Sequence, residues 1–334
     1  MPTQQIAIDI GSANTLIYLK GRGLVLCAPT YIATDRKTGK EMGFGLVAKK
    51  MLGKAPPNIK VSRPIRDGVI DDIEDTTLLL ARYLEKAELV SFIARPDAYV
   101  GVSEKYTGVE IRALQEAVYE AGTRNVTTVK KTLAAAVGAG MKVLSHRGSM
   151  IVDIGEGTTE CAVISRGDVV VSRCDKIAGS DMDKAIINYF RNDRKIEIGE
   201  QSAERLKIKL GSAIELIDRG TAPIVGRDLK TGMATSTIAT SKEIRSAIAP
   251  VLKAVVQQIR LTLEATPPEL ASDVCNNGIV LAGGGAMLPG IAEYISSILR
   301  IKVAVAPKPL ECVCVGMGKM LESDGELNRL LYRQ

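Results

Sequence analysis

The chain has 334 residues, 46% of them hydrophobic and 25% charged, which is ordinary for a soluble globular protein. At roughly 100–200 residues per domain, this length predicts two domains. The formal net charge is +6, which permits attraction to nucleic acid or to an anionic membrane. Lys and Arg are interleaved with Asp and Glu, so the pattern favours a solvated surface, and no nucleic-acid partner is expected.

The reactive side chains exclude several classes of site. The cysteines are scattered without a C-x-x-C pair, so we expect reduced thiols in a cytosol rather than a zinc site or a disulfide framework. His146, the one histidine, lies in a loop-like Ser-His-Arg-Gly stretch, which argues against a serine hydrolase or a multi-histidine metal site. The polar N-terminus does not resemble a signal peptide, and no apolar run approaches the ~18 residues of a membrane span. These features predict a cytoplasmic protein.

The N-terminal region predicts a β-hairpin whose first turn carries an acid and a glycine. The apolar strand 6–8 leads to Asp9 and Gly11, and a second strand, an Arg-Gly turn and a third strand follow. The same pattern returns after the apolar strand 150–152, with Asp153 and Gly155 in the turn. Such self-similarity predicts an internal duplication. The positions that agree at a constant offset are Asp9/Asp153, Ile10/Ile154, Gly11/Gly155, Thr15/Thr159, Arg22/Arg166, Gly23/Gly167 and Val25/Val169.

The two turns have the chemistry of a polyphosphate site. Glycine allows positive φ and close approach of the backbone, and successive N–H groups can line an anion site. An aspartate at the end of a strand can hold Mg²⁺, usually through water. One such turn is a weak signal, but two copies in register predict that facing hairpins clamp a polyphosphate from both sides.

The remainder of the chain alternates helices and strands. Residues 107–110 form a capping-box pattern that opens a helix, and residues 201–210 predict another helix. A second capping box at 240–243 opens a long helix that we expect Pro250 to kink. The strand 279–282 is followed by a glycine run, which fits close packing against a flat ligand or a phosphate. A mixed α/β architecture follows.

These residues resemble the superfamily of actin, sugar kinases and heat-shock chaperone ATPases and, over nearly the whole chain, the bacterial actin family MreB. The resemblance implies an α/β actin-like ATPase fold, with two duplicated lobes around a nucleotide cleft, each with a mixed sheet and flanking helices. It implies lobes at 1–145 and 146–315, small subdomains at about 33–75 and 181–240, and a C-terminal segment, 316–334, that returns to the first lobe. The matching stretches are DIGSANTLIYLKGRG (9–23), RPIRDGVIDD (63–72), LAAAVGAG (133–140), MIVDIGEGTTECAVIS (150–165), SAERLKIKLGSA (202–213), PPELASD (267–273) and LAGGGAML (281–288).

The same resemblance implies a site for ATP and Mg²⁺. Asp9 and Asp153 would hold the metal through water. The expected nucleotide contacts are a first phosphate loop at Gly11, Ser12, Ala13 and Asn14, a second at Gly155, Gly157 and Thr158, a further loop at Gly179 and Asp183, adenine and ribose contacts from Glu204 and Lys207, and packing on the adenosine by Gly283, Gly284 and Gly285.

The family pattern breaks before the alanine-rich segment. MreB proteins typically have Glu-Glu-Pro where this chain has Lys130, Lys131 and Thr132, so Lys131 replaces the glutamate thought to orient the attacking water. An ammonium has three donors and no acceptor, and a neighbouring triphosphate favours its charged form. Loss of a positioned base lowers a rate by ~10²–10⁴-fold, so we expect weak or absent ATP hydrolysis.

A second departure is Glu156, which stands where MreB proteins usually have glycine. Three interpretations are open: Glu156 places the water and keeps the ATPase active, it pairs with Lys131 so that the two changes offset each other, or it is a solvated turn residue. Pairing predicts that Lys131→Glu alone fails to restore full activity unless Glu156 is also changed to Gly.

The resemblance also implies a biological role. Head-to-tail contacts give open filaments, so the chain is expected to polymerise, with antiparallel pairing of filaments, in cell shape, elongation or motility. Other MreB-like subunits are candidate partners, and a non-polymerising nucleotide-dependent regulator of other filaments is the alternative. The segment 89–96, with Phe92 and Ile93, falls where some relatives insert an apolar loop, so it predicts contact with the anionic inner membrane surface, with core packing as the alternative.

Overall fold

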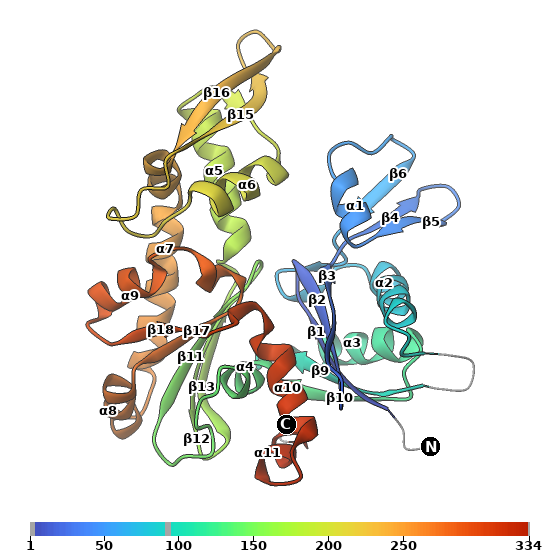
Figure 1. Ribbon diagram of the computed structural model, residues 1–334, viewed down its shortest axis with the longest axis vertical. Helices are drawn as coiled ribbons and strands as arrows, with labels where there is room; N and C mark the ends of the chain where they lie inside the picture. Colours follow the sequence, from blue (N-terminus) through green and yellow to red (C-terminus); the bar gives the residue numbers. More distant parts are fainter. Residues whose placement is uncertain (1–3, 91–94, 333–334) are drawn as a thin grey trace.

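Two lobes stand side by side, and the computed structural model describes residues 4–90 and 95–332 of the chain. In Figure 1 the first lobe, in blue and teal, lies on the right, and the second, in green to orange, lies on the left. The predicted membrane residues Phe92 and Ile93 lie outside the described residues.

The first lobe is built on a five-stranded sheet in the order β10-β9-β1-β2-β3. Its first three strands form an antiparallel meander, whereas β9 and β10 continue from β1 in parallel. The strands are β1 (Gln5–Ile10), β2 (Asn14–Leu19), β3 (Gly23–Pro29), β9 (Asp97–Val102) and β10 (Asn125–Lys130).

The second lobe repeats this topology, in the order β13-β12-β11-β17-β18. An antiparallel meander is again followed by two parallel strands, so the predicted duplication and actin-like α/β fold are confirmed. The strands are β11 (Ser149–Ile154), β12 (Thr159–Ser165), β13 (Asp168–Asp175), β17 (Ile279–Ala282) and β18 (Val303–Val305).

Helices flank the two sheets, and their ends follow the sequence signals. The expected capping boxes at Thr107 and Thr240 are present, and Pro250 lies inside the long α7. The core between helices and sheets is mainly aliphatic. The flanking helices are α2 (Ile73–Lys86) and α3 (Gly108–Glu120) in the first lobe, and α5 (Gly179–Asn192), α7 (Ser241–Glu264), α8 (Pro268–Asn277) and α9 (Ile291–Leu299) in the second.

A small three-stranded sheet stands at the upper end of each lobe in Figure 1. On the first lobe, β4, β5 and β6 form one sheet beside α1, and β7 pairs with β8; on the second lobe, β14, β15 and β16 form another beside α6. The bounds are β4 (Ile32–Asp35), β5 (Glu41–Phe44), α1 (Leu46–Met51), β6 (Ile59–Ser62), β7 (Ile65–Arg66), β8 (Val69–Ile70), β14 (Ile196–Glu197), α6 (Glu200–Leu210), β15 (Thr221–Asp228) and β16 (Ala234–Thr240).

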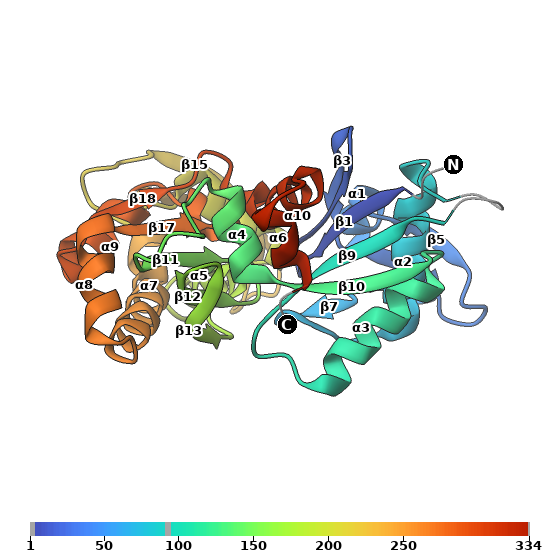
Figure 2. The ribbon, with the colours of Figure 1, turned by 90° about the horizontal axis from the view of Figure 1, so that it is seen from below.

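Two central helices, α4 and α10, join the lobes at their lower end, and Figure 2 shows both between the two main sheets. They touch through glycines: a Cβ added at Gly138 would lie 1.9 Å from the Cys312 carbonyl oxygen, and one added at Gly316 would lie 1.8 Å from that of Ala134. The chain ends along α11 and η3, beside α10 and β10. The bounds are α4 (Lys131–Gly138), η1 (Gly284–Met287), η2 (Pro309–Glu311), α10 (Cys312–Glu322), α11 (Glu326–Arg329) and η3 (Leu330–Tyr332).

Within residues 4–90 and 95–332, the helices are too short or too polar to span a bilayer.

Candidate functional site

A cavity of about 510 Å³ lies between the lobes, above the central helices, and most of the residues singled out from the sequence line it. Its volume falls in the range of roughly 300–1,000 Å³ that is typical of small-molecule sites. The lining includes Asp9, Gly11, Ser12, Ala13, Asn14, Lys131, Asp153, Gly155, Glu156, Gly157, Thr158, Gly179, Glu204, Lys207, Gly283, Gly284 and Gly285.

The two duplicated turns have the same backbone geometry. The Gly11 N–H donates to the Asn14 carbonyl oxygen at 3.0 Å, and the Gly155 N–H donates to the Thr158 carbonyl oxygen at 2.8 Å. The turns also meet, since a Cβ added at Gly157 would lie 2.9 Å from Oγ of Ser12. The hairpins therefore face each other across one space, as a clamp for a polyphosphate requires.

The glycine run after β17 forms the third wall. Gly283 has φ +81°, and a Cβ there would lie 2.3 Å from the Ile154 carbonyl oxygen and 2.4 Å from Oδ1 of Asp153. A side chain at this position would therefore strain the backbone and collide with the end of β11. Because glycine has no side chain, the backbone at Gly283 can lie directly beside the second turn.

Lys131 reaches the floor of the cavity between two acids. β10 ends at Lys130, whose ammonium turns outward to Asp168 at 2.9 Å, and α4 begins at the next residue. Lys131 points inward instead, and its Nζ lies 3.8 Å from Oδ1 of Asp9 and 3.8 Å from Oδ2 of Asp153. The two aspartates, at the ends of β1 and β11, thus share one cation supplied by the chain.

The charges on this floor are strongly coupled. Burial alone would lower the pKa of Lys131, but the nearby Asp9 and Asp153, followed by Glu160, raise it well above its usual value. Burial raises the pKa of Asp9, and Lys131 opposes that shift. Burial also raises the pKa of Glu160 to about 8. Lys131 therefore stays charged at neutral pH and is unsuited to act as a base.

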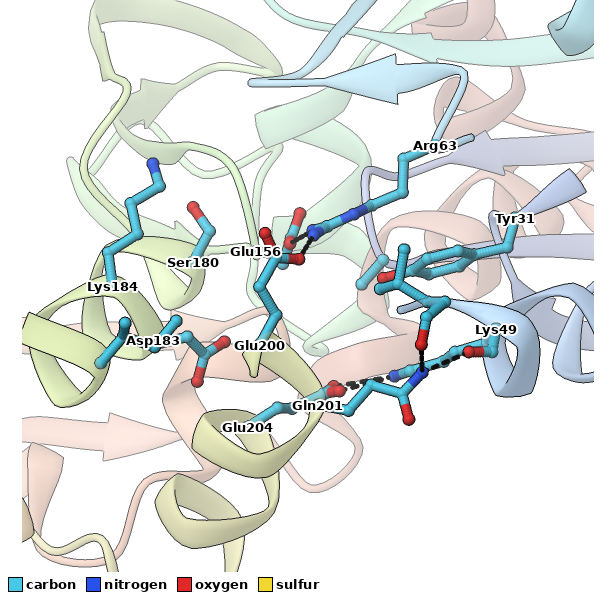
Figure 3. A pocket seen from close by; sticks show the side chains of 13 residues that line it. Tyr31, Lys49, Arg63, Glu156, Ser180, Asp183, Lys184, Glu200, Gln201 and Glu204 are labelled. Carbon is cyan, nitrogen blue, oxygen red and sulfur yellow. Dashed lines mark hydrogen bonds and ion pairs between the residues drawn. The ribbon is translucent and has the colours of Figure 1, made fainter. Parts of the chain in front are cut away.

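The mouth of the cleft is bridged by side chains from both lobes (Figure 3). Arg63 of the first lobe donates to Glu156 at 2.6 Å and to Glu200, both of the second lobe. Lys49 binds Glu204 at 2.8 Å, and Gln201 donates to the Lys49 carbonyl oxygen at 2.5 Å. These contacts hold the upper parts of the lobes together.

Of the three interpretations of Glu156, the pairing with Lys131 is wrong. Glu156 binds Arg63 at the mouth, whereas Lys131 lies on the floor with the two aspartates. Sequence reasoning missed the partner because Arg63 lies in a matching stretch to which no role was assigned. It also gave no role to Glu160, which follows the second turn, or to Tyr106; both line the cavity.

Asp183 does not line the main cavity but lies beside Lys207, in the adjoining pocket at the mouth that Glu156 and Glu204 also line. Lys207 binds its Oδ2 at 2.7 Å and donates to the Gly179 carbonyl oxygen at 2.8 Å. The other oxygen, Oδ1, is buried without a partner among the described residues. This carboxylate therefore holds Lys207 in position rather than forming part of the main cavity wall.

The folded chain is expected to lose stability as pH rises from about 4 to 6 because of Asp183. Burial raises its pKa from 3.8 to about 6, against the opposing charge of Lys207. In that window the folded state holds a proton that the unfolded state has lost, so stability falls by about 3 kcal/mol at roughly 1.4 kcal/mol per pKa unit. Urea unfolding at several pH values should show a flatter profile for Asp183→Asn. Asp71→Asn, at an exposed ion pair with Arg66, is the control; an unchanged profile in Asp183→Asn contradicts this assignment.

Comparison with known proteins agrees with this geometry. The family model described as "MreB/Mbl protein" matches residues 3–329. The cell shape-determining protein Mbl of Bacillus cereus is 40% identical over 333 residues, covering 100% of both chains, and the cell shape-determining protein MreB of Escherichia coli K12 is 41% identical over 327 residues, covering 96% of this chain and 94% of the relative. The crystal structure of MreB5 of Spiroplasma citri bound to AMPPNP superposes with a TM-score of 0.92 at 33% identity, covering 96% of each chain. With its duplicated actin-like lobes and this whole-length similarity, the chain belongs to the MreB/Mbl family of cell shape-determining actin homologues.

Proposed function

We propose that the chain is an ATP-binding filament subunit that hydrolyses ATP slowly, and that it acts in the cytoplasm in cell shape or motility. The observation that carries the nucleotide site is the pair of matching turns, which meet across a cavity of about 510 Å³ with a glycine wall beside them. The relative from S. citri is described as bound to AMPPNP, an ATP analogue, which supports the same ligand class here.

Slow hydrolysis follows from the chemistry of Lys131. A group that activates water must accept a proton or a hydrogen bond, and a charged ammonium cannot. Glu156 does not replace it, because its carboxylate is bound to Arg63 at the mouth. Glu160 has the chemistry to accept a proton only once it ionises, and its pKa of about 8 keeps it mostly neutral at pH 7.

Polymerisation is proposed from the family and is tested together with hydrolysis. The purified chain is incubated with ATP, and pelleting and phosphate release are measured in the same sample. We expect pelleted filaments with little phosphate released.

A chain that stays monomeric at high concentration favours the alternative of a nucleotide-dependent regulator of other filaments. Phosphate release as fast as in MreB relatives overturns the assignment of slow hydrolysis. Electron microscopy of the pellet then tests antiparallel pairing.

Arg63→Ala is expected to speed release of bound nucleotide roughly tenfold, because it removes the link from the first lobe to Glu156 and Glu200. Bridging charge-assisted hydrogen bonds are worth about 1.5–3 kcal/mol, and tenfold corresponds to about 1.4 kcal/mol. Release of a fluorescent ATP analogue in stopped flow measures the effect. Arg66→Ala is matched in charge but removes only the exposed contact to Asp71, so its release rate should equal the wild type. Equal rates in all three proteins contradict a role for this bridge.

Membrane binding is proposed for the segment that contains Phe92 and Ile93. Apolar side chains and a net charge of +6 suit an anionic bilayer surface. The double variant Phe92→Ser with Ile93→Ser should lose most of its binding in pelleting with phosphatidylserine-containing liposomes. Unchanged binding of the double variant to liposomes would contradict a membrane contact through this segment.

A further inference from the structure

A partly buried ammonium stands at the point where the family resemblance places a divalent cation. Nζ of Lys131 lies 3.8 Å from one oxygen of Asp9 and 3.8 Å from one oxygen of Asp153, and its side chain is 17% exposed. A Mg²⁺ held through its water shell stands roughly 4 Å from such oxygens, because a metal–water bond of about 2.1 Å is followed by a hydrogen bond. The residues present therefore do not fit a hydrated metal between the two carboxylates.

The fold holds this ammonium in place. Lys131 is the first residue of α4, directly after β10, so the backbone fixes where the side chain starts. Asp9 and Asp153 are 10% and 6% exposed, and buried carboxylates without a cation are strongly unfavourable. Moving Lys131 aside for a metal would break both ion pairs, and a divalent cation beside a charged lysine is repelled.

The same ammonium is available to a ligand. At 3.8 Å its contacts with the two aspartates are ionic rather than hydrogen-bonded, so these two contacts do not use its N–H groups, which can donate to a phosphate oxygen. Lysine is a common phosphate ligand, acting as a point charge. Lys131 lines the cavity together with the two phosphate turns, so one cation faces both the acids and the expected phosphates.

We propose that the Lys131 ammonium takes the place of the divalent cation, so that this chain binds its nucleoside triphosphate without Mg²⁺. The inference rests on the proposed nucleotide site and deepens it by naming metal-free ATP as the ligand. Mg²⁺ between Asp9 and Asp153 suits a chain that has glutamate at position 131. In this chain the Lys131 ammonium, at the start of α4, replaces it.

The test is ATP binding by calorimetry, with the full chain, in EDTA and in excess Mg²⁺. We expect the wild type to bind ATP in EDTA at least as tightly as in excess Mg²⁺, because Mg²⁺ in excess converts most of the free nucleotide to its metal complex. A site that depends on the metal would instead lose roughly 100-fold or more of its affinity in EDTA, since several charge-assisted contacts disappear together.

Lys131→Met tests the residue directly. In EDTA its ATP affinity should fall roughly tenfold to hundredfold below the wild type, the range of one lost charge-assisted contact, and excess Mg²⁺ should restore it. Lys130→Met is the matched control: it removes the neighbouring positive charge, which pairs with Asp168 and also acts on Glu104, and it leaves Lys131 beside both aspartates. Its affinities should equal those of the wild type in both buffers.

The outcomes separate the two proposals. Wild-type binding of ATP only in Mg²⁺ overturns the built-in cation and leaves the proposed nucleotide site standing. Absence of ATP and ADP binding in both buffers overturns the nucleotide site itself. Circular dichroism checks folding, and if Lys131→Met does not fold, the wild-type comparison in the two buffers still decides.

Discussion

Lys131→Glu is expected to raise the rate of phosphate release from ATP roughly 100-fold, and only when Mg²⁺ is present. The change supplies a carboxylate that can accept a proton from water, and a positioned base contributes ~10²–10⁴-fold to a rate. It also removes the ammonium that Asp9 and Asp153 share and leaves a third carboxylate beside them, so the site then needs a metal. Phosphate release with and without Mg²⁺, at equal nucleotide saturation, measures both effects.

The structure simplifies this experiment. Since Glu156 binds Arg63 and not Lys131, the single change should be sufficient, and adding Glu156→Gly should bring no further large gain. Lys130→Glu is the control for the change of charge, because that side chain faces Asp168 outside the cavity. A Lys131→Glu protein that binds ATP and Mg²⁺ but remains as slow as the wild type would show that another feature limits hydrolysis.

Gly316→Ala is expected to destabilise the chain by about 3 kcal/mol or more, although it adds one methyl group. The added Cβ would lie 1.8 Å from the Ala134 carbonyl oxygen, so α10 must move away from α4. Overpacking of this kind typically costs about 1–3 kcal/mol, and more where backbone blocks backbone. Because the two helices join the lobes, the displacement also opens the cavity floor. Urea unfolding, with ATP affinity as a second readout, measures both effects.

Gly108→Ala is the matched control for this prediction. It is also a helical glycine, but an added Cβ would come no nearer than 3.9 Å to a neighbouring side chain, an ordinary contact. Its stability should lie within about 0.5 kcal/mol of the wild type. Equal stability of the two variants would mean that α4 and α10 are packed less closely than the structure describes.

The sequence by itself determined the local features and the family. The acid and glycine of each turn, the capping boxes at Thr107 and Thr240 and the strand before Gly283 depend on residues close together in the chain, where side-chain periodicity and turn chemistry act directly. The repeat of one pattern at a constant offset also predicted two equivalent sheets, because similar orders of strands and turns in the sequence form similar supersecondary structure.

Only the tertiary structure decided which charges meet. Arg63 and Glu156 are far apart in the chain, as are Lys131 and Asp9, and several charged residues lay near each predicted turn. One hypothesis from the sequence paired Glu156 with Lys131 because both were expected at the same place in the site. The packing of the two lobes separates them. Arg63 and Glu156 meet at the mouth of the cleft, whereas Lys131, at the start of α4, points to the two aspartates. A charge pairs with whatever the fold places within a few ångströms, and that distance is fixed by how the sheets and central helices pack, which no local pattern records.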